Sequence, residues 1–279
     1  VAGEPNSIFF ELFFKVIKKK IKSPIILIAS KRLIMLQAKI LKKKINFNII
    51  NEYDTIMKKK YLKKINLIDI DFKQLSGFNK ITSRSNHYIS TCFNIAIKLL
   101  KNNVSNKLIN GPISKKTFLD KKFLGITEYI SKEFLIDKNA MLIFNKDLSV
   151  CPVTTHLPIK SVSKKISKDV IGEKVFLINS FYEKQFKFKP KIAILGLNPH
   201  CESIHKFNED EEIIKPAVID LKKLNYKVSG PYSADTIFLK ENRKKYDVVL
   251  GMYHDQVLTA IKTLFEYDAI NITLGLPFI

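Results

Sequence analysis

The sequence predicts an α/β protein whose sheets are mostly parallel. Short apolar runs rich in β-branched residues alternate along the chain with longer amphipathic stretches, and this alternation is typical of βαβ units. The 279 residues are 46% hydrophobic, which is ordinary for a globular protein and supplies enough Ile, Leu, Val and Phe for a substantial core. A chain of this length suits one large α/β domain or two smaller ones.

The expected strands are the short apolar runs, and the expected helices lie between them. The strands cover residues 25–30, 47–50, 66–70, 107–113, 141–145, 148–156, 191–200, 246–254 and 270–276. The helices cover residues 87–101, 160–186, 209–225 and 234–245. Asn208 and Ser233 precede the last two helices and are good N-caps, and the acidic run at 209–212 complements the N-terminal end of the helix dipole.

A domain boundary is expected where the periodic pattern breaks. The stretch KKTFLDKKFLG, near residues 115–125, is charged and non-periodic, so we expect an N-terminal α/β domain over 1–125 and a second α/β domain over 126–279. The chain starts at Val1 and stops inside the apolar stretch NITLGLPFI. We therefore expect a fragment that lacks a C-terminal segment, because native termini rarely leave such a stretch uncovered.

Composition excludes several classes of protein. No run of about 18 uncharged apolar residues occurs, so no membrane span is expected. No secretory leader is visible at the start of the chain. The three cysteines are scattered and odd in number, which argues against a disulfide scaffold and favours the reducing cytoplasm.

The formal charge of +22 raises the question of nucleic-acid binding. Arg32, Arg84 and Arg243 are the only arginines among 48 basic residues, whereas base readout and bidentate phosphate recognition favour arginine. The lysines are also spread along the whole chain. We therefore interpret the charge as solvated surface and keep a basic nucleic-acid-binding protein as the alternative from another functional class.

Histidines follow three of the expected strands. His156, His200 and His254 end the runs VTTH, LGLNPH and GMYH. Ligands of open α/β sheets bind outside the carboxyl ends of the strands, so these three imidazoles could converge on one point. Three neutral nitrogens with an open position make a catalytic divalent-metal site, most often for zinc. The alternative is that each histidine only bonds a neighbouring loop, and the spacing matches no local zinc motif.

Other polar groups lie near the same expected edge. NGPISKK at 110–116 is a plausible anion-facing turn, and Lys262 could meet a phosphate or a carboxylate. Asp235 falls in the first turn of an expected helix, where a carboxylate stabilises the helix in any case. No G-x-G occurs anywhere in the chain, so the usual dinucleotide fingerprint and a P-loop are both absent.

These motifs together resemble one family of enzymes. They are GMYHDQVLTAIK, INITLGLPFI, VTTHLP, GLNPH, SGPYSADTIF and NGPISKK, in that family's order once sorted by position. The chain is similar from residue 3 to residue 279 to the 4-hydroxythreonine-4-phosphate dehydrogenases of vitamin B6 synthesis. The resemblance implies a homodimer of two-domain α/β/α subunits with the isocitrate/isopropylmalate dehydrogenase fold, which binds NAD or NADP without the glycine fingerprint.

The resemblance also implies the residues of the site. A divalent metal (zinc, alternatively magnesium or cobalt) would be held by His156, His200 and His254, the last from the partner subunit, at the dimer interface. Substrate contacts carry over to Thr127, Lys262 and Asn271. The candidates for catalytic roles are Asp235, Asp255 and Lys262. Asp255 and Gln256 are expected to orient His254 or the substrate without binding the metal themselves.

The implied reaction is the oxidation of 4-phosphooxy-L-threonine at its 3-hydroxyl by NAD or NADP. The 3-oxo acid formed has its carbonyl β to a carboxylate and decarboxylates readily. Two departures from the family pattern matter: Ile126 stands in GITE where the family commonly has a substrate-binding histidine, and Ser7, Ile8 and Phe9 stand where glycines are expected. A related dehydrogenase for a four-carbon sugar-acid phosphate is therefore the nearest alternative, and an inactive fragment is a third.

Overall fold

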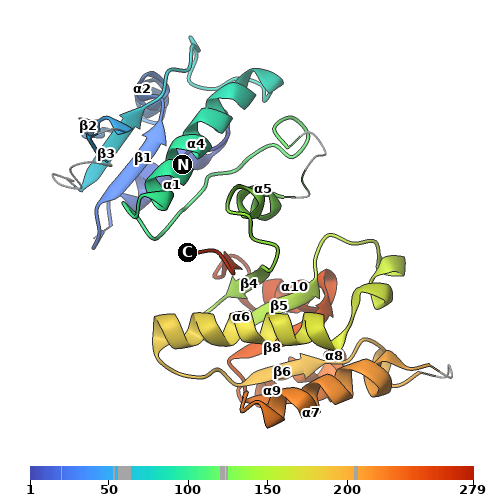
Figure 1. Ribbon diagram of the computed structural model, residues 1–279. Helices are drawn as coiled ribbons and strands as arrows, with labels where there is room; N and C mark the ends of the chain where they lie inside the picture. Colours follow the sequence, from blue (N-terminus) through green and yellow to red (C-terminus); the bar gives the residue numbers. More distant parts are fainter. Residues whose placement is uncertain (20, 53, 56–63, 120–122, 124, 204–206) are drawn as a thin grey trace. The chain divides into compact units, whose positions relative to one another are not determined.

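The chain forms two compact units. The structure is a computed structural model that describes residues 1–19, 21–52, 54–55, 64–119, 123, 125–203 and 207–279 (Figure 1). Unit 1 consists of Val1–Glu133 with Pro277–Ile279, and unit 2 of Phe134–Leu276. The division follows Glu133, compared with an expected boundary after residue 125, and the last three residues belong to unit 1. Both units contain parallel strands and helices, so the predicted α/β class is confirmed.

Unit 1 is built on a small parallel sheet. Its elements are α1 (Phe9–Val16), β1 (Ile25–Ala29), α2 (Lys31–Ile40), β2 (Asn48–Ile50), β3 (Ile65–Asp69), α4 (Asn86–Lys101) and α5 (Ile126–Glu133). The strand order is β1-β3-β2, and both pairings are parallel. Phe10 and Phe14 of α1 pack with Leu27 of β1 and Leu33 of α2 in one buried cluster. The apolar face of α1 is therefore fixed against the sheet and α2.

Unit 2 is built on a larger sheet that orders its strands β7-β6-β8-β5-β4-β9. The strands are β4 (Ala140–Phe144), β5 (Ser149–Thr154), β6 (Ile192–Leu195), β7 (Val228–Tyr232), β8 (Val248–Tyr253) and β9 (Ile270–Leu274). The helices are α6 (Lys168–Phe186), α7 (Lys215–Lys223), α8 (Ala234–Ile237), α9 (Lys240–Arg243) and α10 (His254–Phe265), with a π-helical turn at Asp210–Ile214. β4 is antiparallel to both β5 and β9, whereas β7, β6, β8 and β5 run parallel.

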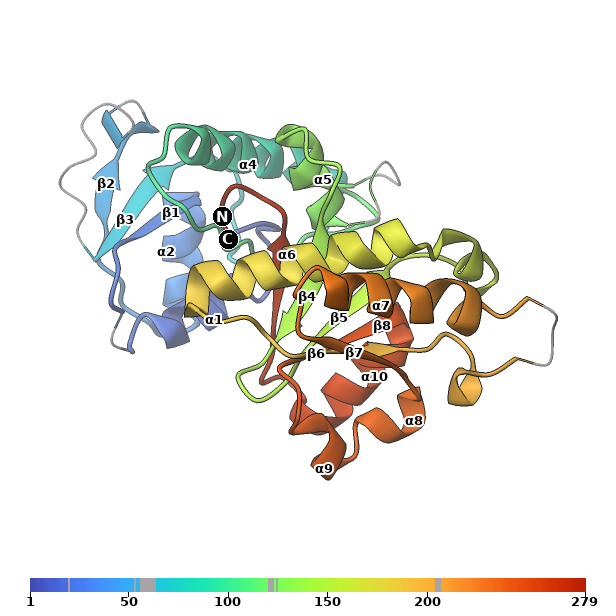
Figure 2. The ribbon, with the colours of Figure 1, turned by 60° about the horizontal axis from the view of Figure 1, so that its bottom comes forward.

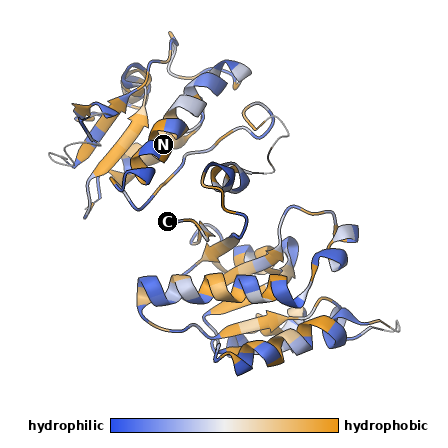
Figure 3. Ribbon diagram, viewed as in Figure 1, coloured by the Kyte–Doolittle hydropathy of each residue, from blue (hydrophilic) through white to orange (hydrophobic). Residues whose placement is uncertain are grey.

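Helices cover both faces of this sheet. α6 and α7 lie on one face, and α8 and α10 lie on the other (Figure 2). Alternate residues of β5 contact the helices on opposite faces of the sheet. Val150 packs in the cluster that includes Val257 of α10, whereas the Ser149 hydroxyl accepts a hydrogen bond from Tyr182 of α6 at 2.9 Å. The central strands β6 and β8 are accordingly hydrophobic along their length, whereas the helices carry hydrophilic stretches (Figure 3).

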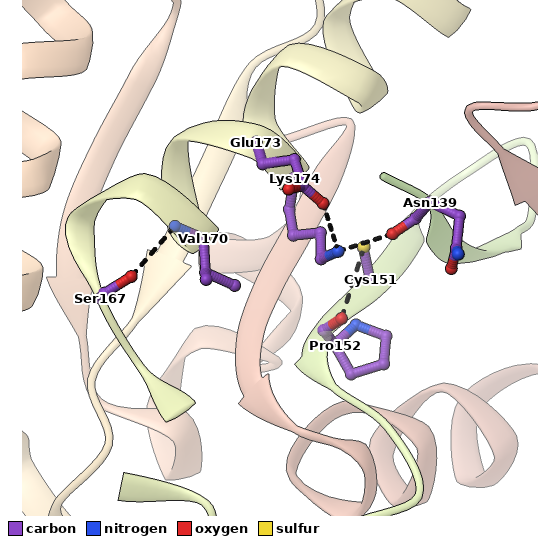
Figure 4. A network of polar contacts seen from close by, with 7 residues as sticks. All are labelled: Asn139, Cys151, Pro152, Ser167, Val170, Glu173 and Lys174. Atoms are coloured by element: carbon purple, nitrogen blue, oxygen red, sulfur yellow. Dashed lines mark hydrogen bonds and ion pairs between the residues drawn. The ribbon is translucent and has the colours of Figure 1, made fainter. Parts of the chain in front are cut away.

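Polar contacts fix the long helix α6 on the sheet (Figure 4). The Ser167 hydroxyl caps the helix by accepting a bond from the Val170 amide at 3.2 Å. One turn further, the Lys174 ammonium donates to the Asn139 carbonyl at 2.6 Å and pairs with Glu173 at 2.8 Å. A largely buried lysine is tolerated here because a carbonyl and a carboxylate replace the water that it loses.

The sequence-based elements differ from the structure in several places, and the helices α1, α2, α5 and α10 were not among the expected ones. Residues 107–113 form no strand. The Leu108 amide donates a hydrogen bond to the Ile279 carbonyl, and the Gly111 amide donates one to the Val1 carbonyl, so isolated hydrogen bonds take the place of a β-ladder. β7 was not predicted because Gly230 and Pro231 interrupt its pattern, yet an edge strand tolerates proline. The predicted helix at 234–245 is two short helices, α8 and α9, separated by two residues.

Candidate active site

Three neighbouring parallel strands of unit 2 carry the candidate site. β8 lies between β6 and β5, with Ile194 paired to Leu250 and Thr154 paired to Tyr253. The Thr154 hydroxyl also donates to the Met252 carbonyl at 2.8 Å, which aligns the ends of β5 and β8. Chain segments that leave these strands therefore start from the same edge of the sheet, where ligands of α/β proteins bind.

His156 and His254 come together at this edge. His156 lies two residues after β5, and His254 directly follows β8 as the first residue of α10. Their ring centroids are 6.1 Å apart. Both line a cavity of about 240 Å³ with Thr155, Leu157, Ile159, Tyr253 and Asp255. Since Thr154 and Tyr253 are register partners, the two rings are neighbours because of the sheet itself.

Asp255 contacts the His254 ring directly. Its Oδ1 lies 2.6 Å from Nδ1 of His254, while the Asp255 side chain is 80% exposed and the histidine 35% exposed. A carboxylate on one ring nitrogen fixes the ring orientation and raises its basicity as a metal ligand. Asp255 therefore makes the contact with His254 that its predicted orienting role requires. Because Asp255 occupies Nδ1 of the ring, Nε2 is the nitrogen that could bind a metal ion.

Gln256 bonds to the backbone of two strands rather than to the His254 ring. Its amide oxygen accepts a bond from the Met252 amide at 2.7 Å, and its amide nitrogen donates to the Gly196 carbonyl at 2.7 Å. Both ends of the side chain are thus bound to backbone at the ends of β8 and β6. Gln256 links two strands and does not contact His254 through these bonds.

His200 lies on a tight turn after β6. The turn Pro199–Cys201 is a single 3-10 turn in which His200 has φ 57° and Cys201 has φ 62°. Both values lie in the left-handed region, which is uncommon for residues other than glycine and marks a conformation that surrounding contacts must hold. The imidazole is exposed, and His200 does not line the cavity that His156 and His254 share.

The residues present fit a metal only in part within one chain. Two imidazoles on one tetrahedral zinc ion, with Zn–N bonds of about 2.0–2.1 Å, have ring centroids roughly 5 Å apart, so the 6.1 Å spacing of His156 and His254 is within about 1 Å of that of a shared ion. Within the described part of one chain, however, no group of three His, Cys, Asp or Glu side chains could hold a metal.

The sequence-predicted substrate residues are distributed over both units. Thr127 is on α5 of unit 1, whereas Lys262 and Asn271 belong to unit 2. Lys262 is exposed in the last turn of α10, eight residues from His254, which is about 12 Å along the helix axis. Asn271 is exposed on the edge strand β9. None of the three belongs to the cavity lining.

Asp235 lies near the turn that carries His200. It is exposed in the first turn of α8, and its charge acts on Cys201. Burial raises the pKa of the Cys201 thiol, and the Asp210 carboxylate, with smaller effects of Glu202 and Asp235, raises it further. The thiol is therefore protonated at neutral pH and is a poor nucleophile there.

Comparison with known proteins decides the family. The family described as "Pyridoxal phosphate biosynthetic protein PdxA" matches residues 20–279. The chain belongs to the PdxA family. The predicted resemblance is thereby confirmed.

Relatives of this PdxA protein span nearly its whole length. A 4-hydroxythreonine-4-phosphate dehydrogenase from Sulfurihydrogenibium sp. (strain YO3AOP1) is 36% identical over 99% of the chain and 86% of the relative. One from Wigglesworthia glossinidia brevipalpis is 33% identical over 99% of the chain and 84% of the relative. The solved structure of a Salmonella typhimurium protein assigned the same activity superposes with a TM-score of 0.83, at 26% identity, over 99% of this chain and 86% of that one.

These likenesses confirm the predicted isocitrate/isopropylmalate dehydrogenase-like fold of the PdxA protein. No helix among the described residues is both long enough and apolar enough to cross a bilayer. The cavity residues Thr155, Leu157, Ile159 and Tyr253 were not assigned from the sequence. The sequence signal that could have identified Leu157 and Ile159 is their place within three residues of His156. The structure leaves the two side chains 36% and 68% exposed.

Proposed function

We propose that this PdxA protein oxidises the 3-hydroxyl of 4-phosphooxy-L-threonine with NAD or NADP and the assistance of a divalent metal. The product is a 3-oxo acid that loses carbon dioxide to give 3-amino-2-oxopropyl phosphate, a precursor in vitamin B6 synthesis, in the cytoplasm. Family membership and the names of its relatives support the reaction class. The observation that carries the proposal is the His156–His254 pair, 6.1 Å between ring centroids, at the carboxyl edge of the sheet.

The histidines would hold the metal. His156, His200 and His254 supply three neutral nitrogens, a donor set that suits zinc and also accepts cobalt; magnesium, which prefers oxygen ligands, is the less suitable alternative. The chemistry that such an ion supplies is Lewis acidity toward a hydroxyl group and its developing negative charge. Asp255 holds the His254 ring through the 2.6 Å contact with Nδ1.

Other residues of the chain bind the substrate and move its proton. Lys262 provides a cation for the phosphate, and Thr127 and Asn271 provide neutral polar groups. Asp235 and Asp255 are exposed carboxylates near the histidines and are the candidates to accept the hydroxyl proton, with Lys262 as a third candidate.

A homodimer completes the site in this proposal. The described residues of one chain do not bring a third metal ligand to His156 and His254. Apolar side chains also surround the histidines at the surface: Ile159 is 68% exposed and Leu157 36% exposed in the single chain. A partner subunit that contributes its own histidine would cover them, as symmetric interfaces commonly do.

Metal analysis of purified variants tests the proposal. We expect stoichiometric metal in the wild type and its loss, together with loss of substrate oxidation, in His156→Ala, His200→Ala and His254→Ala. His87→Ala is the matched control, because His87 is an exposed histidine in the first turn of α4, in unit 1. Retention of metal in all three site variants, with the fold intact by circular dichroism, would overturn the proposed metal site.

The alternative substrate is a four-carbon sugar-acid phosphate. Ile126 favours it, because an apolar residue at the start of α5 takes the place of the family's substrate-binding histidine. The ratio of kcat/KM for the two substrates separates the proposals. A ratio in favour of the sugar acid would assign that substrate and leave the metal and the reaction type unchanged.

A further inference from the structure

One acidic side chain at the start of the helical segment after β6 is buried completely. Asp210 is 0% exposed, whereas Glu211 and Glu212, which follow it in the sequence, are exposed. An ionised carboxylate in such a place needs hydrogen-bond donors around it. Asp210 finds them in the segment that leaves β6 and leads to His200.

Three hydrogen bonds join Asp210 to this segment. Oδ1 accepts from the Leu197 amide at 2.7 Å, and Oδ2 accepts from the Asn198 amide at 3.1 Å and from the Asn198 side-chain amide at 2.9 Å. The Asn198 carbonyl in turn accepts from the Cys201 amide at 3.1 Å and so closes the turn around His200. The carboxylate therefore holds the backbone that determines where His200 stands.

Gly196 of this segment lies directly against the carboxylate. A Cβ atom on Gly196 would lie 2.6 Å from Oδ1 of Asp210 and 2.7 Å from the Cys201 sulfur, so the segment and the acid are in direct contact. The hydrogen bonds of Asp210 and Asn198 flank the turn in which His200 and Cys201 have φ values of 57° and 62°. Left-handed residues persist where surrounding structure over-determines them.

The same segment is bound to the strand that leads to His254. The Gly196 carbonyl accepts from the Gln256 side chain at 2.7 Å, and the oxygen of that side chain accepts from the Met252 amide at 2.7 Å. A continuous set of hydrogen bonds thus runs from Asp210 through residues 196–198 to Gln256 and the end of β8. It joins the backbone before His200 to the backbone before His254.

We propose that Asp210 and Gln256 are positioning residues that hold His200 and His254 at the geometry needed for metal binding. The inference rests on the proposed function, because it assigns the two residues a role toward the histidines that would bind the ion. Asp210 fixes the turn that carries His200. Gln256 fixes the distance between the ends of β6 and β8.

Asp210→Asn is the main test. An amide keeps the shape but replaces one acceptor oxygen with a donor, so at least one of the Leu197 and Asn198 donors loses its partner. We expect Co²⁺ to bind at least about tenfold more weakly, as for other residues that support metal ligands, and its visible absorption spectrum to change. Asp220→Asn, an exposed acid on α7, is the matched control and is expected to change neither.

Gln256→Met serves if Asp210→Asn does not fold, since it removes both side-chain bonds while keeping a similar volume. A variant with a lowered Tm but the wild-type Co²⁺ affinity and spectrum would show a merely structural role and would overturn the inference. His200→Ala distinguishes a failure of the proposed metal site from a failure of the positioning role. If it keeps Co²⁺ binding unchanged, the metal site itself has failed; if it loses binding while Asp210→Asn and Gln256→Met keep it, only the positioning role has failed.

Discussion

Single residues in this protein acquire their properties from burial more than from their type. Glu209, Asp210, Glu211 and Glu212 form one acidic run in the sequence, and helix-dipole arguments treat them alike. The structure buries Asp210 alone of this run completely and gives it three donors from the segment after β6. A sequence cannot single out this residue, because the donors that satisfy it belong to another part of the chain.

The buried thiol of Cys151 predicts a loss of stability in alkaline solution. Burial raises the pKa of Cys151 from its ordinary value of 9.0 to about 12, despite the opposing charge of Lys174. Above pH 9 the unfolded chain loses this proton and the folded chain keeps it. The stabilisation is therefore complete below pH 9 and is lost as pH rises toward 12, at up to about 1.4 kcal/mol per pH unit.

Denaturant unfolding of Cys151→Ala at several pH values checks this prediction. We expect the free energy of unfolding to fall less steeply with pH in the variant than in the wild type between about pH 9 and 11. Cys201→Ala is the comparison variant, since that thiol is only partly buried and should change the slope less. Equal slopes in wild type and Cys151→Ala would show that the thiol does not stay protonated in the folded chain.

At the scale of elements, a serine before a helix does not always act as a cap. Ser167 accepts a bond from the Val170 amide at the start of α6, whereas Ser233 makes no side-chain cap bond at the start of α8. The sequence predicted Ser233 as a cap and α8 as part of a longer helix. The structure instead ends α8 after one turn, and the predicted cap bond is not formed.

This difference predicts unequal effects of the same substitution. Ser167→Ala removes a cap bond and is expected to lower the free energy of unfolding by about 1 kcal/mol. Ser233→Ala removes none and is expected to change it by less than about 0.5 kcal/mol. Chemical denaturation of the two variants measures both values. Comparable losses in the two would contradict the assignment of the cap to Ser167.

At the scale of the whole molecule, the proposed dimer allows two arrangements of the three histidines. The family resemblance assigns His254 to the partner subunit, whereas the single chain already places His156 and His254 6.1 Å apart. In the first arrangement His156 and His200 come from one chain. In the second, His156 and His254 come from one chain and His200 from the other.

Mixed dimers of inactive variants distinguish the two arrangements. If His254 comes from the partner, coexpressed His156→Ala and His254→Ala chains recover about a quarter of wild-type activity, because half of random dimers contain one intact site of two. His156→Ala with His200→Ala recovers none in that case. The second arrangement predicts the reverse pattern. Recovery in neither pair would show that all three histidines of a site come from one chain.

Much of the fold could be predicted from the sequence because its signals are local. Apolar runs and amphipathic stretches identified the strands β1, β2, β3, β4, β5, β8 and β9 to within a few residues, and the parallel α/β class followed. Elements that depend on distant partners were not predicted correctly. Residues 107–113 bond to both ends of the chain and form no ladder, and β7 forms although it contains a glycine and a proline, because it pairs with β6.

The sequence by itself determined that His156, His200 and His254 follow apolar strands, since strand and loop patterns are readable from neighbouring residues. Only the tertiary structure decided which of them meet. The register of β5 and β8 brings His156 and His254 together, while His200 depends on a turn held by a buried acid from another segment. Strand register and burial arise from contacts between residues far apart in the chain, and local sequence patterns do not record them.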